Sequence, residues 1–371
     1  MSALINEHGW SAKYTSPKGE VLAVQKLIGR YWYEIRVEIS YFILELVSSP
    51  VESLEDLEIQ HFHVFTDVRA VLRTLDLMIW PFGVAPASTG CLFPAESTRE
   101  DIIEDGFYSI WDRCKPIRRH CHIFSQQVAV DVAVKKLIPA INALYKNLGT
   151  IMSRFANAKV LKDGRAYHEG GYYWWLESPH ESTGPKYDHG GILIFPKCEF
   201  VDFSDFYERV WHTAHVMVMR DGRLHYSADD SLTWHRFIQQ KSCTLLNEQG
   251  QKVSIDLEVS DLNWMFHVPT IDFKPHYKFS DAMSLDRFLE LYSSKDINGF
   301  MHEFCRRAWI EIKPCSPHYE NNAMDIPRYF YEIFENIDSY VSDSQSITWD
   351  QARVNRNRAI GYADNHVGTE F

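Results

Sequence analysis

With 371 residues, the chain is long enough for two domains or one large one, and it can bury a sizeable hydrophobic core without disulfides or metals. Its 45% hydrophobic and 24% charged residues are typical of a globular protein and exclude a mainly disordered chain. The net charge of −12 disfavours nucleic acid and anionic membranes as general partners, because like charges repel at long range. Local basic clusters such as Arg306–Arg307 are interpreted as solvated surface.

Cysteine usage and the first residues indicate the compartment. The seven cysteines are scattered singly, which indicates reduced thiols and argues against a zinc site built on cysteines. The N-terminal stretch lacks the basic-then-apolar layout of a signal peptide, and no apolar run reaches about 18 residues, the length of a membrane helix. We therefore expect a cytoplasmic protein, of the cell or of a host, with no membrane partner.

Two strands and one helix are predicted in the first part of the chain. Polar and apolar residues alternate over 34–41, which is the period of a half-buried strand. A second candidate strand carries Ile59, His61, His63 and Phe65 on one side. Thr66 precedes apolar residues at helical spacing, so we interpret it as the N-cap of a helix that ends before Pro81. Residues 82–97 are rich in Gly, Pro, Ser and Ala and predict a loop.

Helical spacing continues beyond this loop and then gives way to strands. A short helix is predicted over 98–113 and the longest helix over 126–157, with a kink at Pro139. From 164 to 268 the pattern changes to strands and tight turns. Strands are predicted at 215–219 and 253–259.

Turn and cap signals place further elements in the second half of the chain. Asp221–Gly222 and Asn247–Gly250 predict hairpin turns, because Asn, Asp and Gly tolerate the positive φ of such turns. Thr348 and Gln351 have the spacing of a capping box at the start of a helix. Helices are predicted near 284–294, 299–311, 326–341 and 348–360.

These elements together predict an α+β fold rather than a βαβ alternation. A β-rich antiparallel central region is flanked by helix-bearing N- and C-terminal parts. The boundaries are 1–160 for the α+β N-terminal part, 161–275 for the β-rich middle and 276–371 for the helical C-terminal part. The three parts can also form a single domain.

One local pattern resembles a known structural motif. Ser227-Ala-Asp229-Asp-Ser231-Leu-Thr233-Trp234 resembles the Asp-box of sialidase-like and related β-propellers, in which the Asp accepts backbone N–H groups and the Trp packs across a hairpin. The pattern occurs once, and Ser231 takes the place where the motif has glycine. The resemblance therefore implies a structural β-hairpin at 223–238 rather than a glycosidase.

Histidines are dense in the middle of the chain and suggest a metal site. Imidazole and carboxylate are good ligands for zinc, iron or manganese, so Asp188, His189, His212 and His215 are candidate metal ligands. Histidines held by local hydrogen bonds or exposed to solvent are the alternative interpretation. Two further pairs, His61–His63 on a predicted strand and His120–His122, are interpreted as structural.

The run Tyr172-Tyr173-Trp174-Trp175 is the densest aromatic segment. On a strand its side chains alternate between two faces, and only one set needs to fill a core. The other set requires a second layer, a ligand or a partner, because large exposed aromatic patches usually mark contacts. We interpret this segment as a candidate protein interface, with core packing and a stacking platform as alternatives.

Two functional hypotheses follow. The first is an interaction or assembly component with a protein partner or in a homo-oligomer, such as a viral or phage structural or accessory protein. The second is a metal-dependent hydrolase or oxygenase that uses the His/Asp residues of the middle region. No phosphate-binding loop, dinucleotide fingerprint or nucleophile elbow is present, so the sequence identifies neither a cofactor nor a substrate.

Overall fold

The computed structural model describes thirteen stretches of the chain, and every structural statement below concerns these residues. They are residues 1–15, 19–37, 43–79, 126–155, 160–162, 165–167, 195–211, 216–221, 223–227, 232–247, 250–265, 272–315 and 322–359. The fold is α+β, as predicted from the sequence, and its sheets are antiparallel. Within these stretches, no helix has the length and apolar character that crossing a membrane requires.

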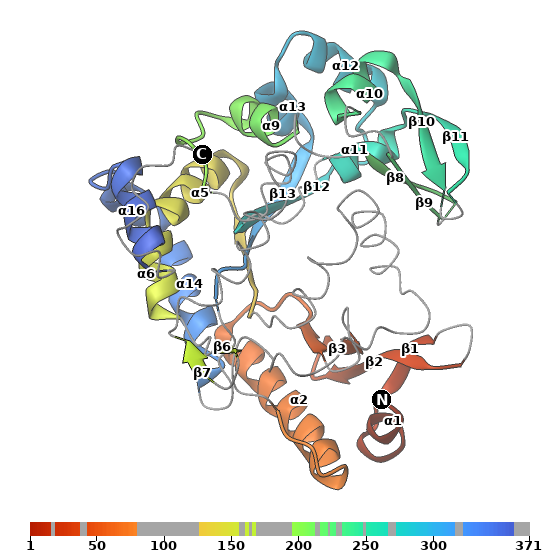
Figure 1. The fold of residues 1–371 in the computed structure, drawn as a ribbon, viewed down its shortest axis with the longest axis vertical. Helices are drawn as coiled ribbons and strands as arrows, with labels where there is room; N and C mark the ends of the chain where they lie inside the picture. Colours follow the sequence, from red (N-terminus) through yellow and green to blue (C-terminus); the bar gives the residue numbers. More distant parts are fainter. Residues whose placement is uncertain are drawn as a thin grey trace.

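The N-terminal part forms a sheet with helices on one face, at the bottom of Figure 1. Four strands pair in chain order, and Val24, Ile28 and Ile35 on one face join a small core with Val64 and Val68 of a long helix. The elements are α1 (Ser2–His8), β1 (Ser11–Thr15), β2 (Val21–Ile28), β3 (Tyr31–Val37), β4 (Leu44–Ser48) and α2 (Leu54–Thr74).

A three-stranded sheet occupies the centre of the remaining structure. Its strand order is β12-β13-β5, so β13 is the central strand and β12 and β5 are the edges. The helix α5 packs on β12 and β13, and α13 packs on β13. The elements are β5 (Val128–Val132), the short 3-10 helix η1 (Val134–Lys136), α5 (Leu137–Lys146), β12 (Phe273–Phe279), α13 (Ile297–Phe304) and β13 (Cys305–Ile312).

A second sheet of four strands lies beside this centre, at the upper right of Figure 1. Its order is β11-β10-β9-β8. The strands are β8 (Met217–Arg220), β9 (Arg223–Tyr226), β10 (Ser242–Asn247) and β11 (Lys252–Asp256). The neighbouring helices are α9 (Phe203–Trp211), α10 (Trp234–Gln240), α11 (Val259–Met265) and α12 (Leu285–Ser293).

The C-terminal helices pack on the other side of the centre, at the left of Figure 1. They contact α5 and α6 (Leu148–Arg154). A Cβ atom at Gly149 would lie only 2.5 Å from the backbone carbon of Asn355, so glycine is required where α6 crosses α16. The remaining elements are α14 (Asp325–Glu335), α15 (Ile337–Ser344), α16 (Trp349–Ala359) and a short hairpin of β6 (Val160–Lys162) and β7 (Arg165–Tyr167).

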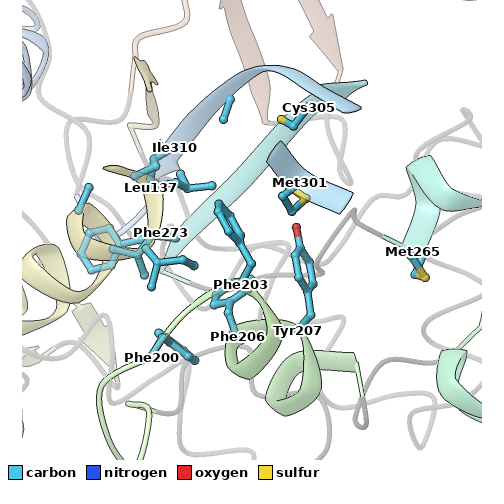
Figure 2. Packing of buried hydrophobic residues seen from close by; sticks show 14 of the residues in the cluster. Leu137, Phe200, Phe203, Phe206, Tyr207, Met265, Phe273, Met301, Cys305 and Ile310 are labelled. Carbon is cyan, nitrogen blue, oxygen red and sulfur yellow. The ribbon is translucent and has the colours of Figure 1, made fainter. Parts of the chain in front are cut away.

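One hydrophobic cluster joins the central sheet, the second sheet and the C-terminal helices. In Figure 2 the side chain of Tyr207 projects from α9 toward the central strands. Phe273 of β12 packs edge-on against Tyr145 of α5, with ring centroids 4.9 Å apart. This cluster draws residues from all three parts that the sequence suggested, whereas the N-terminal sheet has a separate small core. The central sheet is thus anchored on one face by an extensive aromatic core.

The predicted strand over 59–65 is wrong, because these residues belong to α2. The helix begins after Ser53, whose side chain accepts the N–H of Asp56 as an N-cap, well before the predicted cap at Thr66. Ile59 and Phe62 are exposed on this helix, whereas its buried residues Gln60, Val64, Val68 and Val71 follow helical spacing rather than a period of two.

The predicted long helix over 126–157 is also divided differently. Residues Val128–Val132 form β5, and helix begins only at η1 and α5. Pro139 does not kink a helix, because it lies in the first turn of α5, where a missing N–H costs no hydrogen bond. Similarly, the predicted helix over 299–311 ends at Phe304, and the chain continues directly into β13. β-branched and aromatic residues in these stretches favour strand where a neighbouring strand is present.

The hairpin predicted over 223–238 is wrong in its second half. β9 ends at Tyr226, and Thr233 is the N-cap of α10, with its hydroxyl accepting the N–H of Arg236 at 3.3 Å. Trp234 begins this helix and is buried in the main cluster. Ser227 is buried and donates its N–H to the carbonyl of Val216, while Asp229 lies outside the described residues.

Several local predictions are confirmed. The turn at Asp221 joins β8 to β9 and the turn at Asn247–Gly250 joins β10 to β11, with positive φ at Asp221 and Gly250. The capping box is present, because Gln351 Oε1 accepts the N–H of Thr348 at 3.1 Å and Thr348 Oγ1 accepts the N–H of Gln351 at 3.2 Å. The helices at 284–294, 326–341 and 348–360 correspond to α12, the pair α14 and α15, and α16. The predicted loop at 82–97 and helix at 98–113 lie outside the described residues.

Candidate functional site

The residues predicted from the sequence for an interface and a metal site lie outside the described residues. These are Tyr172, Tyr173, Trp174 and Trp175 for the interface, and Asp188, His189, His212 and His215 for the metal. Both hypotheses therefore stay predictions. Within the part of the chain that the structure describes, no group of three or more His, Cys, Asp or Glu side chains could hold a metal ion.

The pair His61–His63 does not share a face, since both residues lie on α2 rather than on a strand. His61 packs against Tyr33 with the ring centroids 6.1 Å apart, and burial lowers its pKa to about 4. His63 is exposed. His61 is thus a neutral packing residue of the N-terminal core, and the second pair, His120–His122, lies outside the described residues.

The central sheet has one apolar and one polar face. Ala308, Ile310 and Ile312 of β13 point into the main hydrophobic cluster. The residues between them point to the opposite side, because successive side chains on a strand alternate. This second side, called the polar face below, carries Asp131 of β5, Lys274, His276 and Lys278 of β12, and Arg307, Trp309 and Glu311 of β13.

A histidine–glutamate contact lies at the middle of the polar face. His276 Nε2 is 2.7 Å from Glu311 Oε2, although the two residues are 35 positions apart in the sequence. The imidazole also stacks on the indole of Trp309, with ring centroids 5.3 Å apart and planes inclined by 1°. The strand pairing explains this geometry, because His276 stands directly opposite Trp309 and diagonal to Glu311. His276 is thus oriented by two neighbours on β13.

Lys274 and Lys313 lie beside Glu311, and Asp272 immediately precedes β12. Lys274 stands directly opposite Glu311 and is only 7% exposed. Lys313 Nζ lies 3.4 Å from Glu311 Oε1, and its backbone N–H donates to the carbonyl oxygen of Asp272 at 2.9 Å. Asp272 is 2% exposed, and its Oδ1 has no hydrogen-bond partner among the described residues. We call Asp272, Lys274, His276, Glu311 and Lys313 the titratable cluster.

Burial and neighbouring charges displace the pKa values of this cluster in opposite directions. Burial raises the pKa of Asp272 to about 7, against the opposing charge of Lys313. Burial, reinforced by Lys313 and opposed by Glu311, lowers the pKa of Lys274 to about 8. Burial alone would raise the pKa of Glu311, but the hydrogen bond from His276 and the charges of Lys313 and Lys274 outweigh it and hold this pKa well below its usual range.

A second group lies at the other end of the polar face. The guanidinium of Arg307 binds the carboxylate of Asp131 through two nitrogens, with Nη2 2.6 Å and Nε 2.9 Å from Oδ2. The same guanidinium lies 6.0 Å from the ring centroid of Trp309. Beside it is a pocket of about 290 Å³, lined by Asp131, Val132, Ala133, Val134, Arg306, Arg307 and Ala308. Trp309 therefore separates the pocket from the titratable cluster.

None of these residues is among the candidates predicted from the sequence. The helix expected over 299–311 conceals the alternation of Arg307, Trp309 and Glu311. The signal that could reveal the site is the period of two in Arg307–Ile312, where charged or aromatic residues alternate with Ala308, Ile310 and Ile312. The pairing of β12 with β13 then supplies the contact that no sequence spacing reveals.

No protein-family model matches this chain, and searches of curated proteins and of solved structures found no match either.

Proposed function

We propose that the polar face is the acid–base site of an enzyme, in which the His276–Glu311 pair moves a proton to or from a bound substrate. The observation that carries this proposal is the 2.7 Å contact between the two side chains inside a cluster whose pKa values are displaced in opposite directions. Displaced pKa values gather at functional sites, because catalytic acids and bases need values close to the working pH.

Each member of the cluster has a distinct part in this proposal. Glu311 remains ionised and fixes the orientation of the imidazole, as the carboxylate of a catalytic triad does. Lys274 and Lys313 can offset negative charge that develops on the substrate. Asp272, whose pKa is about 7, is half protonated near neutral pH and can serve as a second proton donor.

The alternative is that the cluster only stabilises the fold, and its energetics argue against this. A lysine whose pKa falls on burial and an aspartate whose pKa rises are both held in surroundings that disfavour their charged forms. Such groups reduce stability, and natural proteins retain groups of this kind where activity depends on them. The cluster is therefore better explained by chemistry than by stability.

The test is turnover of p-nitrophenyl acetate and p-nitrophenyl phosphate by the full chain between acidic and basic pH. We expect His276→Gln and Glu311→Gln to lower the rate by about 100-fold or more, the usual contribution of an acid–base residue. His235→Gln is the matched control, because His235 is also half-buried and contacts the hydroxyl of Tyr292 through Nδ1. Turnover that His276→Gln leaves unchanged, or no turnover of either compound, contradicts the proposal.

A second candidate function, interaction with a protein partner or a second copy, is favoured by the open face of the N-terminal sheet. Leu27 of β2 and Trp32 of β3 stand directly opposite each other, and they are 52% and 49% exposed. The ion pairs Lys13–Glu34 and Arg36–Glu45 on the same sheet carry two positive and two negative charges. An apolar centre with a charge-balanced rim suits a protein interface.

Light scattering after size-exclusion chromatography tests this second candidate. Trp32→Lys should dissociate an oligomer that the wild-type chain forms, whereas Phe62→Lys, at an exposed aromatic on the outer side of α2, should not. A wild-type chain that is monomeric at all concentrations would exclude self-association through this face.

A further inference from the structure

The pocket beside Arg307 exists because two paired strands differ in length. β5 pairs with β13 only as far as Val132, which stands opposite Ala308. Beyond this point the chain leaves the sheet and enters η1, while β13 begins three residues earlier at Cys305. The pocket of about 290 Å³ lies at this step in the sheet edge, and its lining includes Ala133 and Val134 after β5 and Arg306 of β13. We call it the edge pocket.

The lining of the edge pocket carries two guanidinium groups and one carboxylate. Arg306 is exposed, and its one hydrogen bond among the described residues is a long contact of 3.4 Å from Nη2 to Ser280 Oγ. Arg307 is fixed in place by its two-nitrogen contact with Asp131. The pocket thus has an excess of positive charge in a chain whose net charge is −12. Guanidinium groups bind phosphate and carboxylate with matched planar geometry.

The edge pocket is close enough to the titratable cluster for one small molecule to reach both. Arg307 and Trp309 are two residues apart on β13, and His276 stands directly opposite Trp309. At about 3.3 Å per residue, the step from Arg307 to the level of His276 is about 7 Å. The half-buried indole of Trp309 forms the surface between them.

We propose that the edge pocket binds the phosphate or carboxylate group of the substrate on which the His276–Glu311 pair acts. This inference rests on the function proposed above and adds the substrate class: a small anion whose charged group lies about 7 Å along the strand from the atom that gains or loses a proton. Arg306 is the main anion ligand, and Arg307 adds a second positive charge that its ion pair with Asp131 partly neutralises.

Calorimetric titration of the full chain with inorganic phosphate, at constant ionic strength maintained with chloride, tests this proposal. We expect saturable binding that Arg306→Ala weakens about tenfold or more, the loss of one strong charge-assisted contact. Arg328→Ala is the matched control, because Arg328 is also an exposed arginine, and its Nη2 lies 2.9 Å from Glu58 Oε2 on a distant helix. Absence of saturable binding, or equal binding by wild type and Arg306→Ala, would overturn the proposal.

A variant that is expected to bind phosphate more tightly controls for damage to the fold. Asp131→Asn removes the carboxylate that competes for Arg307, so phosphate should bind several-fold more tightly. A variant that merely damages the fold cannot bind more tightly. Weaker or unchanged phosphate binding by Asp131→Asn contradicts the proposal.

The experiments test the anion-binding site and the acid–base function independently of each other. If phosphate binding depends on Arg306 but turnover does not depend on His276, the edge pocket stands and the proposed chemistry is wrong. If turnover depends on His276 but phosphate neither binds at Arg306 nor competes with substrate, the chemistry stands and the substrate class is wrong.

Discussion

This chain buries two groups of charged residues, which differ in how far hydrogen bonds and partner charges compensate for the loss of water. The first is the contact of Arg220 on β8 with Asp261 on α11, where Asp261 is 0% exposed. Its carboxylate accepts two hydrogen bonds from Arg220 and one from the N–H of Glu258, and Arg220 also donates to the carbonyls of Met219 and Asp256. Both charges are fully used, and these contacts raise the pKa of Arg220.

The titratable cluster differs in each of these respects. Asp272 has a buried oxygen without a hydrogen-bond partner among the described residues, and burial displaces the pKa values of Asp272 and Lys274 toward their neutral forms. Burial of charge is therefore not itself a sign of structure or of function. The direction of the pKa displacement separates the two, because the contacts of the structural pair raise the pKa of Arg220 and favour its charged form, whereas burial shifts Asp272 and Lys274 toward their neutral forms.

The largest expected effect would confirm the structural side of this comparison. Arg220→Met leaves the Asp261 carboxylate buried without its cation, which should lower the free energy of unfolding by about 3–5 kcal/mol. Urea unfolding measures this loss. A loss close to zero would remove the distinction between the two groups.

The second effect is a pH dependence that belongs to Asp272. Its pKa is about 7 in the folded chain against an ordinary value of 3.8, so the folded chain binds one proton more between these values. Stability from this group is full below about pH 4 and is lost as the pH rises through 7. Because Asn does not titrate, Asp272→Asn should gain stability over wild type across this window, on the order of 4 kcal/mol. Unfolding curves of wild type and Asp272→Asn at pH 4, 5.5 and 7.5 test this prediction. A stability difference that is the same at all three pH values contradicts it.

Lys274→Met should raise the free energy of unfolding by about 2 kcal/mol at pH 7, because it removes a buried ammonium group. Glu311 keeps its contacts with His276 and Lys313 in this variant. The folded pKa of Lys274 is about 8 against an ordinary value of 10.5, so its stability contribution is present above about pH 10.5 and lost as the pH falls through 8. The advantage of Met should therefore be largest below pH 8 and shrink at high pH. An advantage that grows at high pH would be inconsistent with this assignment.

The smallest expected loss of stability, at a helix N-cap, serves as a reference for the other unfolding measurements. Thr348→Ala removes the hydroxyl that accepts the N–H of Gln351 at the start of α16, a contact that involves no residue of either charged group. We expect a loss of about 1 kcal/mol, the usual value of an N-cap, with no dependence on pH. A pH-dependent loss would show that the unfolding assay reports more than the substituted site.

The sequence predicted best where one short stretch decides the structure. The capping box of Thr348 and Gln351 and the turns at Asp221 and Gly250 depend on neighbours within four residues, and all of them are present. Prediction failed where distant residues decide. Most of β13 falls within the helix predicted over 299–311, whereas its pairing with β5 and β12 makes it a central strand.

The candidate site shows the same limit. His276 and Glu311 are 35 residues apart, and nothing in the spacing of either one indicates their contact. The depressed pKa of Lys274 needs both burial and the nearby charge of Lys313, and these arise only in the folded chain. By contrast, the α+β class followed from the change of periodicity along the chain, because each period is a local property.

Urea unfolding of the double variant Asp272→Asn/Lys274→Met at pH 7, beside wild type, tests the central claim most directly. If the cluster is retained for chemistry at the expense of stability, the double variant should unfold at a higher urea concentration with an unchanged dependence on urea. It should also lose turnover. A lower midpoint than wild type would show that the cluster stabilises the fold and would contradict the account.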